Sequence, residues 1–441
     1  MSIVFSVRHL KWIKKLSVLC AACLFYASNV NAVVLADHPK LQQVADQLIA
    51  ENYYTQAELD AVFLNATIQQ SVLKAMTSPA EYKFTWGKYR KLFLQEDRIQ
   101  QGVDFWLQYS ESMRRAEAEY GVPAYIIAAI IGVESKFGKY KGKHKVLDSL
   151  VTLVVGFERR SKFFAKELKQ YLILTKENQL DNAAILGSYA GAVGYPQFIS
   201  SSYRNYAVDF SGDGSIDLID QPIDAIGSVA NYFVENGWLT GQAVSSPAHL
   251  NVPHSIAELA NRQRKIKYSA QQLREQGAQL DTAIPNDEKL NVLMLNASET
   301  VNEPKNSGLY IVRAGDTACQ IADRFNVSCK ELIKLNKLNS KATIFRDQKL
   351  KLPVKKTSTK NAADKSSDKW SVKTVLEDDG VKARYFYTHE NFYVITRYNH
   401  SVLYAMAVHD LSVEINKAMQ IRQAELQTNP QINPQAETVV E

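Results

Sequence analysis

The stretch of sequence that decides the fold is "GVPAYIIAAIIGVESKFG", residues 121–138. Pro123 suits the first turn of a helix, because a backbone N–H would have no partner there. Residues 125–133 are apolar on every side, which predicts a helix at the centre of a core rather than on its surface. Glu134 stands at the inner end of this run, so the sequence sets a carboxylate against an apolar wall. Such a charge is costly without a partner.

Position alone leaves two interpretations of Glu134 open. A glutamate at a helix end can reach water or an arginine, and this is the ordinary case. In the other interpretation, the apolar surroundings disfavour the charged form and raise the pKa of the carboxyl group. A carboxylic acid that keeps its proton near neutral pH can act as a general acid.

The chain around this segment is mainly α-helical by pattern. Residues 38–120 repeat apolar side chains at helical spacing, more helices are expected to about residue 178, and another is expected from Asp224 to Gly237. At 441 residues, the chain is long enough for one large domain or two to three ordinary ones. Its net charge of +6 is mild. This charge would suit an acidic polymer as partner, but a solvated, slightly basic surface explains it at least as well. We expect no nucleic-acid partner.

The N-terminus has the pattern of a secretory signal peptide. Basic side chains from Arg8 to Lys15 precede the short apolar run "LSVLCAACLFYA", and small residues lead to a cleavage point after Ala32. We therefore expect residues 1–32 to be removed and the mature chain to be exported. Cys23 loosely fits a lipoprotein signal, so membrane attachment is expected only if that cysteine is lipidated.

The composition of the sequence changes near residue 296, where helical patterns give way to a linker. A linker leads to a compact unit at residues 308–354, where a strand, two helices and a second strand are expected in that order. Residues 355–370 are polar and of low complexity, which predicts a second linker. The unit carries Cys319 and Cys329, which in an oxidising compartment either form a disulfide or remain two small buried thiols.

Apolar order returns after the second linker. A strand is expected over "FYVITRY", residues 392–398, followed by an amphipathic helix. These elements are too few to build a core of their own. We therefore expect residues 375–422 to pack back on residues 33–300 as one discontinuous domain. Residues 423–441 are expected to be a disordered tail.

Two polar loops follow the central helix. The first, "GSYAGAVGYPQF" at residues 187–198, sets small residues around Ser188 and Gln197, so that a ligand can approach the backbone and meet neutral donors and acceptors. The second, "DFSGDGSIDLID" at residues 209–220, alternates oxygen-bearing side chains and has Gly214 at its sixth position. That is the spacing of a calcium loop, and the alternative is a solvated turn.

Four segments carry a resemblance to a known family. They are "GVPAYIIAAIIGVESKFG", "GSYAGAVGYPQFISSSYRNYAVDFSGDGSIDLID", "DAIGSVANYFVENGW" and "NFYVITRYNHSVLYAMAV". In this order they resemble the membrane-bound lytic transglycosylases of type B. The resemblance implies a lysozyme-like helical fold and cleavage of peptidoglycan glycan strands in the periplasm or at the outer membrane of a Gram-negative envelope. Other cell-wall enzymes remain open as partners.

The resemblance implies that Glu134 is the sole catalytic carboxylate and that no cofactor takes part in catalysis. Protonated, it donates to the glycosidic oxygen between N-acetylmuramic acid (MurNAc) and N-acetylglucosamine (GlcNAc), while the substrate N-acetyl group stabilises the positive centre. The ionised Glu134 then takes the proton of the muramoyl 6-hydroxyl, which closes a 1,6-anhydro ring. One carboxylate thus replaces the usual two of glycoside hydrolysis.

Further residues match the substrate-contact and metal positions of that family. Ser188 and Gln197 match contacts near the acid, and two arginines suit bidentate recognition of lactate or peptide carboxylates. A structural calcium ion is implied at residues 209–224. The matched cleft positions are Tyr89, Arg159, Arg160, Tyr232, Tyr398, Asn399 and Tyr404. The matched metal ligands are Asp209, Ser211, Asp213, the carbonyl of Ser215, and Asp224.

Residues 308–354 resemble a second family, the LysM modules, through "YIVRAGDT", "IADRFNVS", "ELIKLNKLN" and "QKLKLP". Such modules bind glycans that contain N-acetylglucosamine. Asp347 departs from the pattern, because a glycine usually precedes the glutamine at this turn. The implied glycan groove lies near Gly315, Asp316, Thr317 and Ile344.

Two other functions remain open. A muramidase-type hydrolase would need a second carboxylate to position water, and none stands out near Glu134. A non-catalytic scaffold would bind peptidoglycan without cutting it, and the intact Glu134, Ser188 and Gln197 argue against it. The sequence does not distinguish endo from exo cleavage.

Overall fold

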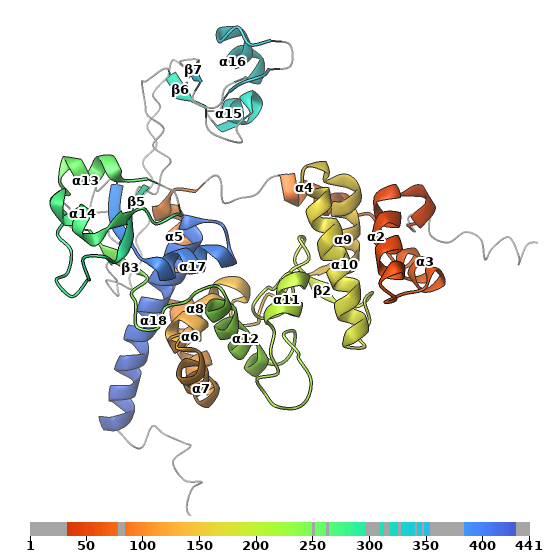
Figure 1. Cartoon of the computed structure of the whole chain (residues 1–441), viewed down its shortest axis with the longest axis horizontal. Coiled ribbons are helices and arrows are strands. Elements are labelled where there is room, and N and C mark those ends of the chain that lie inside the picture. The colour runs from red at the N-terminus through yellow and green to blue at the C-terminus, as the bar shows by residue number, and fades with distance from the viewer. Residues whose placement is uncertain are drawn as a thin grey trace, which may run out of the picture. The chain divides into compact units, whose positions relative to one another are not determined.

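The computed structural model forms two compact units (Figure 1). The helical unit comprises the described parts of Met1–Pro79, Glu96–Gly241 and Leu411–Glu441. The sheet unit comprises the described parts of Ala80–Gln95 and Gln242–Asp410. The structure describes residues 33–77, 84–248, 252–261, 264–296, 309–312, 317–324, 328–339, 342–345, 348–352 and 383–428.

The helical unit confirms the mainly α-helical prediction. Helices α9 and α10 (yellow in Figure 1) pack side by side and both contact α2, while α6, α7 and α12 pack against α8. The helices are α2 (Pro39–Ala50), α3 (Gln56–Leu64), α4 (Gln70–Thr77), α6 (Glu96–Gln108), α7 (Ser110–Tyr120), α8 (Ala124–Ser135), α9 (Val146–Gly156), α10 (Ser161–Glu177), α11 (Ser200–Tyr206) and α12 (Pro222–Glu235), with 3₁₀ turns η1 (Leu35–Asp37) and η3 (Glu158–Arg160).

Helix α8 is the apolar segment from which the prediction started. Nine of its twelve residues are buried, as expected for a helix that is apolar on every side. It begins after Gly121, whose φ of +66° ends α7 in the left-handed region that glycine tolerates. The indole N–H of Trp238 donates to the carbonyl of Gly121 at 3.1 Å, which fixes this corner. The central helix is therefore held at its start by both α7 and the segment after α12.

The sheet unit is built around a four-stranded antiparallel sheet of order β3-β8-β5-β4. Strand β8 (Ala383–Thr388) pairs with β5 (Lys289–Asn296) from Asn291 opposite Thr388 to Asn296 opposite Ala383. Chain segments on either side of the inserted module thus meet in one sheet. The remaining elements are β3 (Ser245–Pro247), β4 (Tyr268–Ser269), α5 (Trp86–Phe93), α13 (His254–Leu259), α14 (Ala270–Glu275) and α17 (Glu390–Tyr398).

The strand predicted over residues 392–398 is wrong. These residues belong to helix α17, and the strand lies one segment earlier, in β8. The aromatic and β-branched composition of "FYVITRY" favours a strand. However, Asn391, Val394 and Ile395 are buried together, at the spacing of one helical face.

A buried histidine links three parts of the sheet unit. His389 is 1% exposed and follows β8. Its Nδ1–H donates to Oε1 of Glu288 at 2.5 Å, and its Nε2 lies 3.0 Å from the hydroxyl of Ser246 in β3. Gln242 also donates to Glu288, at 3.2 Å. Because both ring nitrogens of His389 have a partner, the buried histidine joins the edge strand to Glu288 at little desolvation cost.

The inserted module has the predicted order of strand, two helices and strand. Strands β6 (Leu309–Ile311) and β7 (Lys349–Lys351) pair antiparallel, and the helices between them are α15 (Ala318–Arg324) and α16 (Cys329–Leu335). Cys319 and Cys329 form a disulfide with a Cα–Cα distance of 4.7 Å, which decides between the two states left open. The module core consists of Val312, Ile321, Ala322, Leu332 and Leu350.

The C-terminal helix α18 (Val402–Thr428) begins in the sheet unit and ends in the helical unit. It runs six residues into the segment predicted to be a disordered tail. The sequence there, "AELQT", is rich in helix formers, and Arg422 pairs with Glu425 one turn on. Residues 429–441 lie outside the described residues, as do the predicted signal peptide and the linker at residues 355–370.

Among the described residues, no single helix is long and apolar enough to cross a membrane. The pair α7 and α8, bent by 114° between them, passes the length and composition test together, and α8 is buried in the helical unit.

Candidate active site

Glu134 is the penultimate residue of α8 and is half-buried. It follows directly on the apolar run of this helix. The next turn back toward the core contains Ile130 and Ile131, which are fully buried. The carboxyl group therefore stands where an apolar interior meets an accessible surface.

The chain turns sharply after Glu134. Lys136 and Phe137 have φ values of +50° and +57°, two consecutive non-glycine residues in the left-handed region. Such residues cost free energy and persist only where surrounding contacts fix them, which is common at functional sites. The Ser135 hydroxyl supplies one such contact, donating to the carbonyl of Ile131 at 3.2 Å and accepting the N–H of Gly138 at 3.0 Å. The position of Glu134 is thus fixed from both sides.

The ring of Phe137 folds back against α8. A Cβ placed on Gly132 would lie 2.6 Å from this ring, so only glycine leaves room for it. The ring also lies 5.5 Å from that of Phe105 in α6. The strained turn is therefore anchored by aromatic packing as well as by hydrogen bonds.

Three segments meet beside this turn: the post-acid segment, residues 135–142; the glycine-rich loop, residues 187–198; and the Asp-rich loop, residues 209–220. Glycines at the contacts let the backbones approach. A Cβ on Gly142 would lie 2.0 Å from the backbone of Gly187, and one on Gly194 would lie 2.0 Å from the carbonyl oxygen of Leu218.

Short strands extend the first of these contacts. Strand β1 (His144–Lys145) pairs antiparallel with β2 (Leu186–Gly187), which opens the glycine-rich loop. The N–H of Tyr195 donates to the carbonyl of Leu218 at 2.9 Å, which joins the glycine-rich loop to the Asp-rich loop. The three segments therefore form one hydrogen-bonded framework.

Ser188 and Gln197, the predicted substrate contacts, both belong to this framework. The Ser188 hydroxyl oxygen accepts the N–H groups of Ala190 and Ala192, at 3.3 and 3.0 Å. The Gln197 amide donates to the carbonyls of Lys141 and Gly194, at 3.2 and 2.9 Å, from a backbone with φ of +50°. Both side chains are half-buried and held in place.

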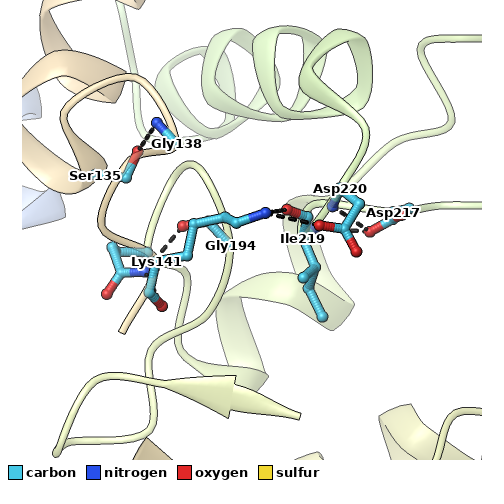
Figure 2. A network of polar contacts seen from close by, with 8 residues as sticks. Ser135, Gly138, Lys141, Gly194, Asp217, Ile219 and Asp220 are labelled. Carbon is cyan, nitrogen blue, oxygen red and sulfur yellow. Dashed lines mark hydrogen bonds and ion pairs between the residues drawn. The ribbon is translucent and has the colours of Figure 1, made fainter. Parts of the chain in front are cut away.

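Lys141 joins the post-acid segment to the Asp-rich loop. Figure 2 shows its side chain reaching across to Ile219 and Asp220. Its ammonium group donates to the Ile219 carbonyl and to Oδ1 of Asp220, both at 2.7 Å, and lies 5.3 Å from the centre of the Tyr195 ring. Sequence reasoning missed this residue.

Asp224 closes the Asp-rich loop from the inside. It is fully buried in the first turn of α12, where Oδ1 accepts the N–H groups of Phe210 and Ser211 at 2.9 and 2.7 Å. Its Oδ2 accepts the N–H of Asp217 at 2.9 Å. This carboxylate therefore organises the loop by itself, with one lone pair of Oδ2 left for a further ligand.

The outer carboxylates of the loop are exposed and ionised easily. The N–H of Gly214, donating to Asp209 at 2.8 Å, holds the pKa of Asp209 below its usual value. The hydroxyl of Ser215, donating to Asp213 at 2.7 Å, does the same for the pKa of Asp213. Carboxylate, hydroxyl and carbonyl oxygens are the donors calcium prefers, so the residues fit that ion in kind. Over the described part of the chain, however, no three His, Cys, Asp or Glu side chains gather as a metal-holding cluster.

The other cleft candidates fall in both units. In the helical unit, Arg159 and Arg160 are exposed at η3, with the Arg160 guanidinium 4.1 Å from the Phe163 ring centre, and Tyr232 is buried beside Tyr206 and Phe198. The sheet unit holds Tyr89, Tyr398, Asn399 and Tyr404.

Within the sheet unit, two of these tyrosines form a pair. The rings of Tyr398 and Tyr404 are nearly parallel, with centres 6.4 Å apart. Tyr89 is buried and packs with Phe84 and Phe93. In the module, Thr317 is exposed and Ile344 half-buried, while Gly315, Asp316 and Asp347 lie outside the described residues.

Comparison with known proteins identifies the family of the chain. The transglycosylase SLT domain matches residues 36–311, and the LysM domain matches residues 310–353. The chain belongs to the transglycosylase SLT domain family. It is 39% identical over 270 residues to membrane-bound lytic murein transglycosylase B of Escherichia coli strain K12, a match that covers 59% of this chain and 73% of the relative.

Solved structures give the same answer for the fold. Soluble lytic transglycosylase SltB1 from Pseudomonas aeruginosa matches with a TM-score of 0.63 and 33% identity, over 85% of this chain and 98% of that one. Escherichia coli lytic transglycosylase Slt35 in complex with calcium matches with a TM-score of 0.64 and 32% identity, over 89% and 98%. This member of the SLT family is therefore a peptidoglycan lytic transglycosylase with a lysozyme-like fold and a LysM domain.

Proposed function

We propose that Glu134 is the single acid and base of this lytic transglycosylase. The observation that carries the proposal is its place: a half-buried carboxyl group at the end of the buried helix α8, followed by a strained turn that packing and hydrogen bonds hold fixed. Catalysis needs a proton donor at a fixed position, because small displacements of a reacting group cost large factors in rate. The apolar helix beneath it favours the protonated form.

The reaction then follows from one carboxyl group. Glu134 donates its proton to the glycosidic oxygen between MurNAc and GlcNAc, and the bond from C1 of MurNAc to that oxygen breaks. The N-acetyl group of MurNAc stabilises the electron-deficient C1. The ionised Glu134 accepts the proton of the 6-hydroxyl, whose oxygen bonds to C1. A 1,6-anhydroMurNAc end and a free GlcNAc hydroxyl result, and Glu134 recovers its proton.

The neighbouring side chains suit substrate binding. The Ser188 hydroxyl oxygen is the acceptor in both of its hydrogen bonds, so its hydrogen can be donated to a sugar oxygen. Both N–H groups of Gln197 point to the protein, so its carbonyl oxygen is available to a sugar hydroxyl or N-acetyl N–H. Exposed Arg159 and Arg160 suit the lactate or peptide carboxylates. The remaining proposed contacts are Tyr89, Tyr232, Tyr398, Asn399 and Tyr404.

Calcium is proposed as a structural ion of the Asp-rich loop. When bound, it would neutralise the loop carboxylates and would take no part in the glycosidic chemistry. Calcium in the millimolar range is expected to raise the thermal midpoint over that in chelator, since an ion that binds only the folded state stabilises it. An unchanged midpoint would contradict this site. Its proposed ligands are Asp209, Ser211, Asp213, the Ser215 carbonyl and Asp224.

We place the enzyme in the periplasm or at the outer membrane of a Gram-negative envelope, where its substrate lies. The name of the Escherichia coli relative, a membrane-bound murein transglycosylase, supports this location. The LysM domain is proposed to bind GlcNAc-containing strands near Gly315, Asp316, Thr317 and Ile344.

The test is digestion of purified sacculi by the mature protein, with soluble products weighed by mass spectrometry. Products with anhydro ends, one water lighter than hydrolysis products, are expected. Reducing ends would identify a muramidase and require a second carboxylate. Protein that pellets with sacculi but releases nothing would identify a scaffold.

A further inference from the structure

Lys141 contacts both loops that border the segment after Glu134. Its backbone carbonyl accepts from Gln197 in the glycine-rich loop, at 3.2 Å. Its ammonium group donates to Ile219 and Asp220 in the Asp-rich loop, both at 2.7 Å (Figure 2). The main chain of Lys141 thus joins the post-acid segment to the glycine-rich loop, and its side chain joins the same segment to the Asp-rich loop.

We propose that Lys141 is a positioning residue for the reaction, which fixes the turn behind Glu134 by fastening it to the Asp-rich loop. This inference depends on the proposed role of Glu134. Lys141 lies seven residues after that glutamate, and the chain between them contains the strained pair Lys136 and Phe137. Without a fastening at its far end, this segment could relax toward ordinary backbone angles and carry the end of α8 with it.

The surface that receives Lys141 is itself fixed. Oδ1 of Asp217 accepts the N–H groups of Ile219 and Asp220, at 2.7 and 3.0 Å. The N–H of Asp217 in turn donates to the buried carboxylate of Asp224 in α12. A continuous set of hydrogen bonds therefore runs from Lys141 to a core helix, and the backbone that carries both acceptors is held in place.

Energetics separate a positioning role from a stabilising one. The Asp220 side chain is 75% exposed, and exposed ion pairs contribute little to stability. Loss of the Lys141 ammonium should therefore leave the fold nearly as stable as before. Its effect on the rate can be larger, because the geometry of a catalytic group enters the rate steeply.

Four lysines alternate through "GKYKGKHK", residues 138–145, and Lys141 is the one whose side chain reaches Asp220 (Figure 2). Lys143, two residues on, is exposed and carries the same charge. It is therefore a matched control for charge, length and sequence neighbourhood.

The experiment compares Lys141→Met, Lys141→Arg and Lys143→Met in the full chain. Each is assayed on soluble uncrosslinked glycan strands, with anhydro ends counted by mass spectrometry, and each thermal midpoint is measured. We expect Lys141→Met to lower kcat about tenfold, with KM within about twofold and the midpoint within about 2 °C of wild type. Lys141→Arg should recover most of the rate, and Lys143→Met should match wild type.

The partner is tested by Asp220→Asn. If Lys141 acts through Asp220, this variant should lower kcat to a similar degree, and the double variant should be no slower than Lys141→Met alone. Independent, multiplying losses would overturn the coupling.

Other outcomes overturn the proposal in distinguishable ways. A kcat within twofold of wild type in Lys141→Met, or an equal loss in Lys143→Met, would remove the positioning role. A fall in kcat that only follows a large drop in midpoint, without recovery in Lys141→Arg, would make Lys141 structural. Glu134→Gln in the same assay tests the acid separately: if it is active, the proposed function itself falls.

Discussion

Glu134 and Asp224 are two carboxylates of the same unit in opposite situations. Asp224 is fully buried and accepts three backbone N–H groups. Glu134 is half-buried and stands between an apolar helix and a strained turn. Three backbone donors compensate the burial of the Asp224 carboxylate, whereas Glu134 stands at the end of an apolar helix and is partly open to water. Burial of a carboxylate alone is thus no sign of catalysis, and what surrounds it decides its role.

Two more carboxylates of the helical unit resemble Asp224 rather than Glu134. Asp148 is buried and accepts the N–H and hydroxyl of Thr67, at 2.9 and 2.7 Å. Glu167 is buried and accepts the N–H and hydroxyl of Ser201, at 3.0 and 2.7 Å. Each of these carboxylates joins segments that are distant in sequence, so its role is structural.

The comparison predicts the largest effect for Glu134→Gln. Glutamine keeps the shape of the side chain but cannot transfer the proton, so the rate of anhydro-end release should fall at least about a thousandfold. The thermal midpoint should stay within about 2 °C of wild type, because glutamine keeps the size and shape of the half-buried side chain. Residual activity near the wild-type rate would remove Glu134 from the mechanism.

Asp224→Ala should instead act on stability. It leaves one buried and two part-buried N–H groups without their acceptor, so the free energy of unfolding should fall by about 3 kcal/mol. Urea unfolding in the presence of chelator measures this loss without any contribution from calcium. Asp213→Ala is the control, since that exposed side chain should cost less than about 1 kcal/mol. Equal losses in the two variants would contradict the contrast drawn between them.

The sequence predicted the features that repeat over many residues. The central helix and its glutamate were visible because a run that is apolar on every side can only be buried, and the order of elements in the LysM domain followed from its alternating patterns. The sequence failed over "FYVITRY", where composition favours a strand and only the burial of Val394 and Ile395 on one face reveals a helix. In a segment of only seven residues, the spacing of apolar side chains is too short a pattern to outweigh composition when helix is distinguished from strand.

The contacts around the site could not be predicted for a different reason. The sequence predicts Asp224 as a metal ligand, but its three N–H donors come from residues 7 to 14 positions earlier, and only the folded loop brings them together. Likewise, nothing in a stretch of alternating lysines selects Lys141. The contacts of Asp224 and Lys141 depend on the position of another loop in the folded protein, and no local sequence pattern encodes that position.

The smallest effect is expected for Glu58, an exposed carboxylate of the same unit. Glu58 accepts from Lys176 at 2.8 Å and from the N–H of Thr55 at 2.7 Å, and these bonds lower its pKa from 4.5 to about 2. A group with a lowered folded-state pKa stabilises the fold above its unfolded pKa and loses that contribution as pH falls toward the folded value. The stability difference between wild type and Glu58→Gln should therefore be constant above pH 5 and shrink between about pH 4.5 and 2. Glutamine can still cap α3, so the helix itself is kept. A difference that stays constant down to pH 2, measured by urea unfolding, would show that Glu58 carries no charge-dependent stability.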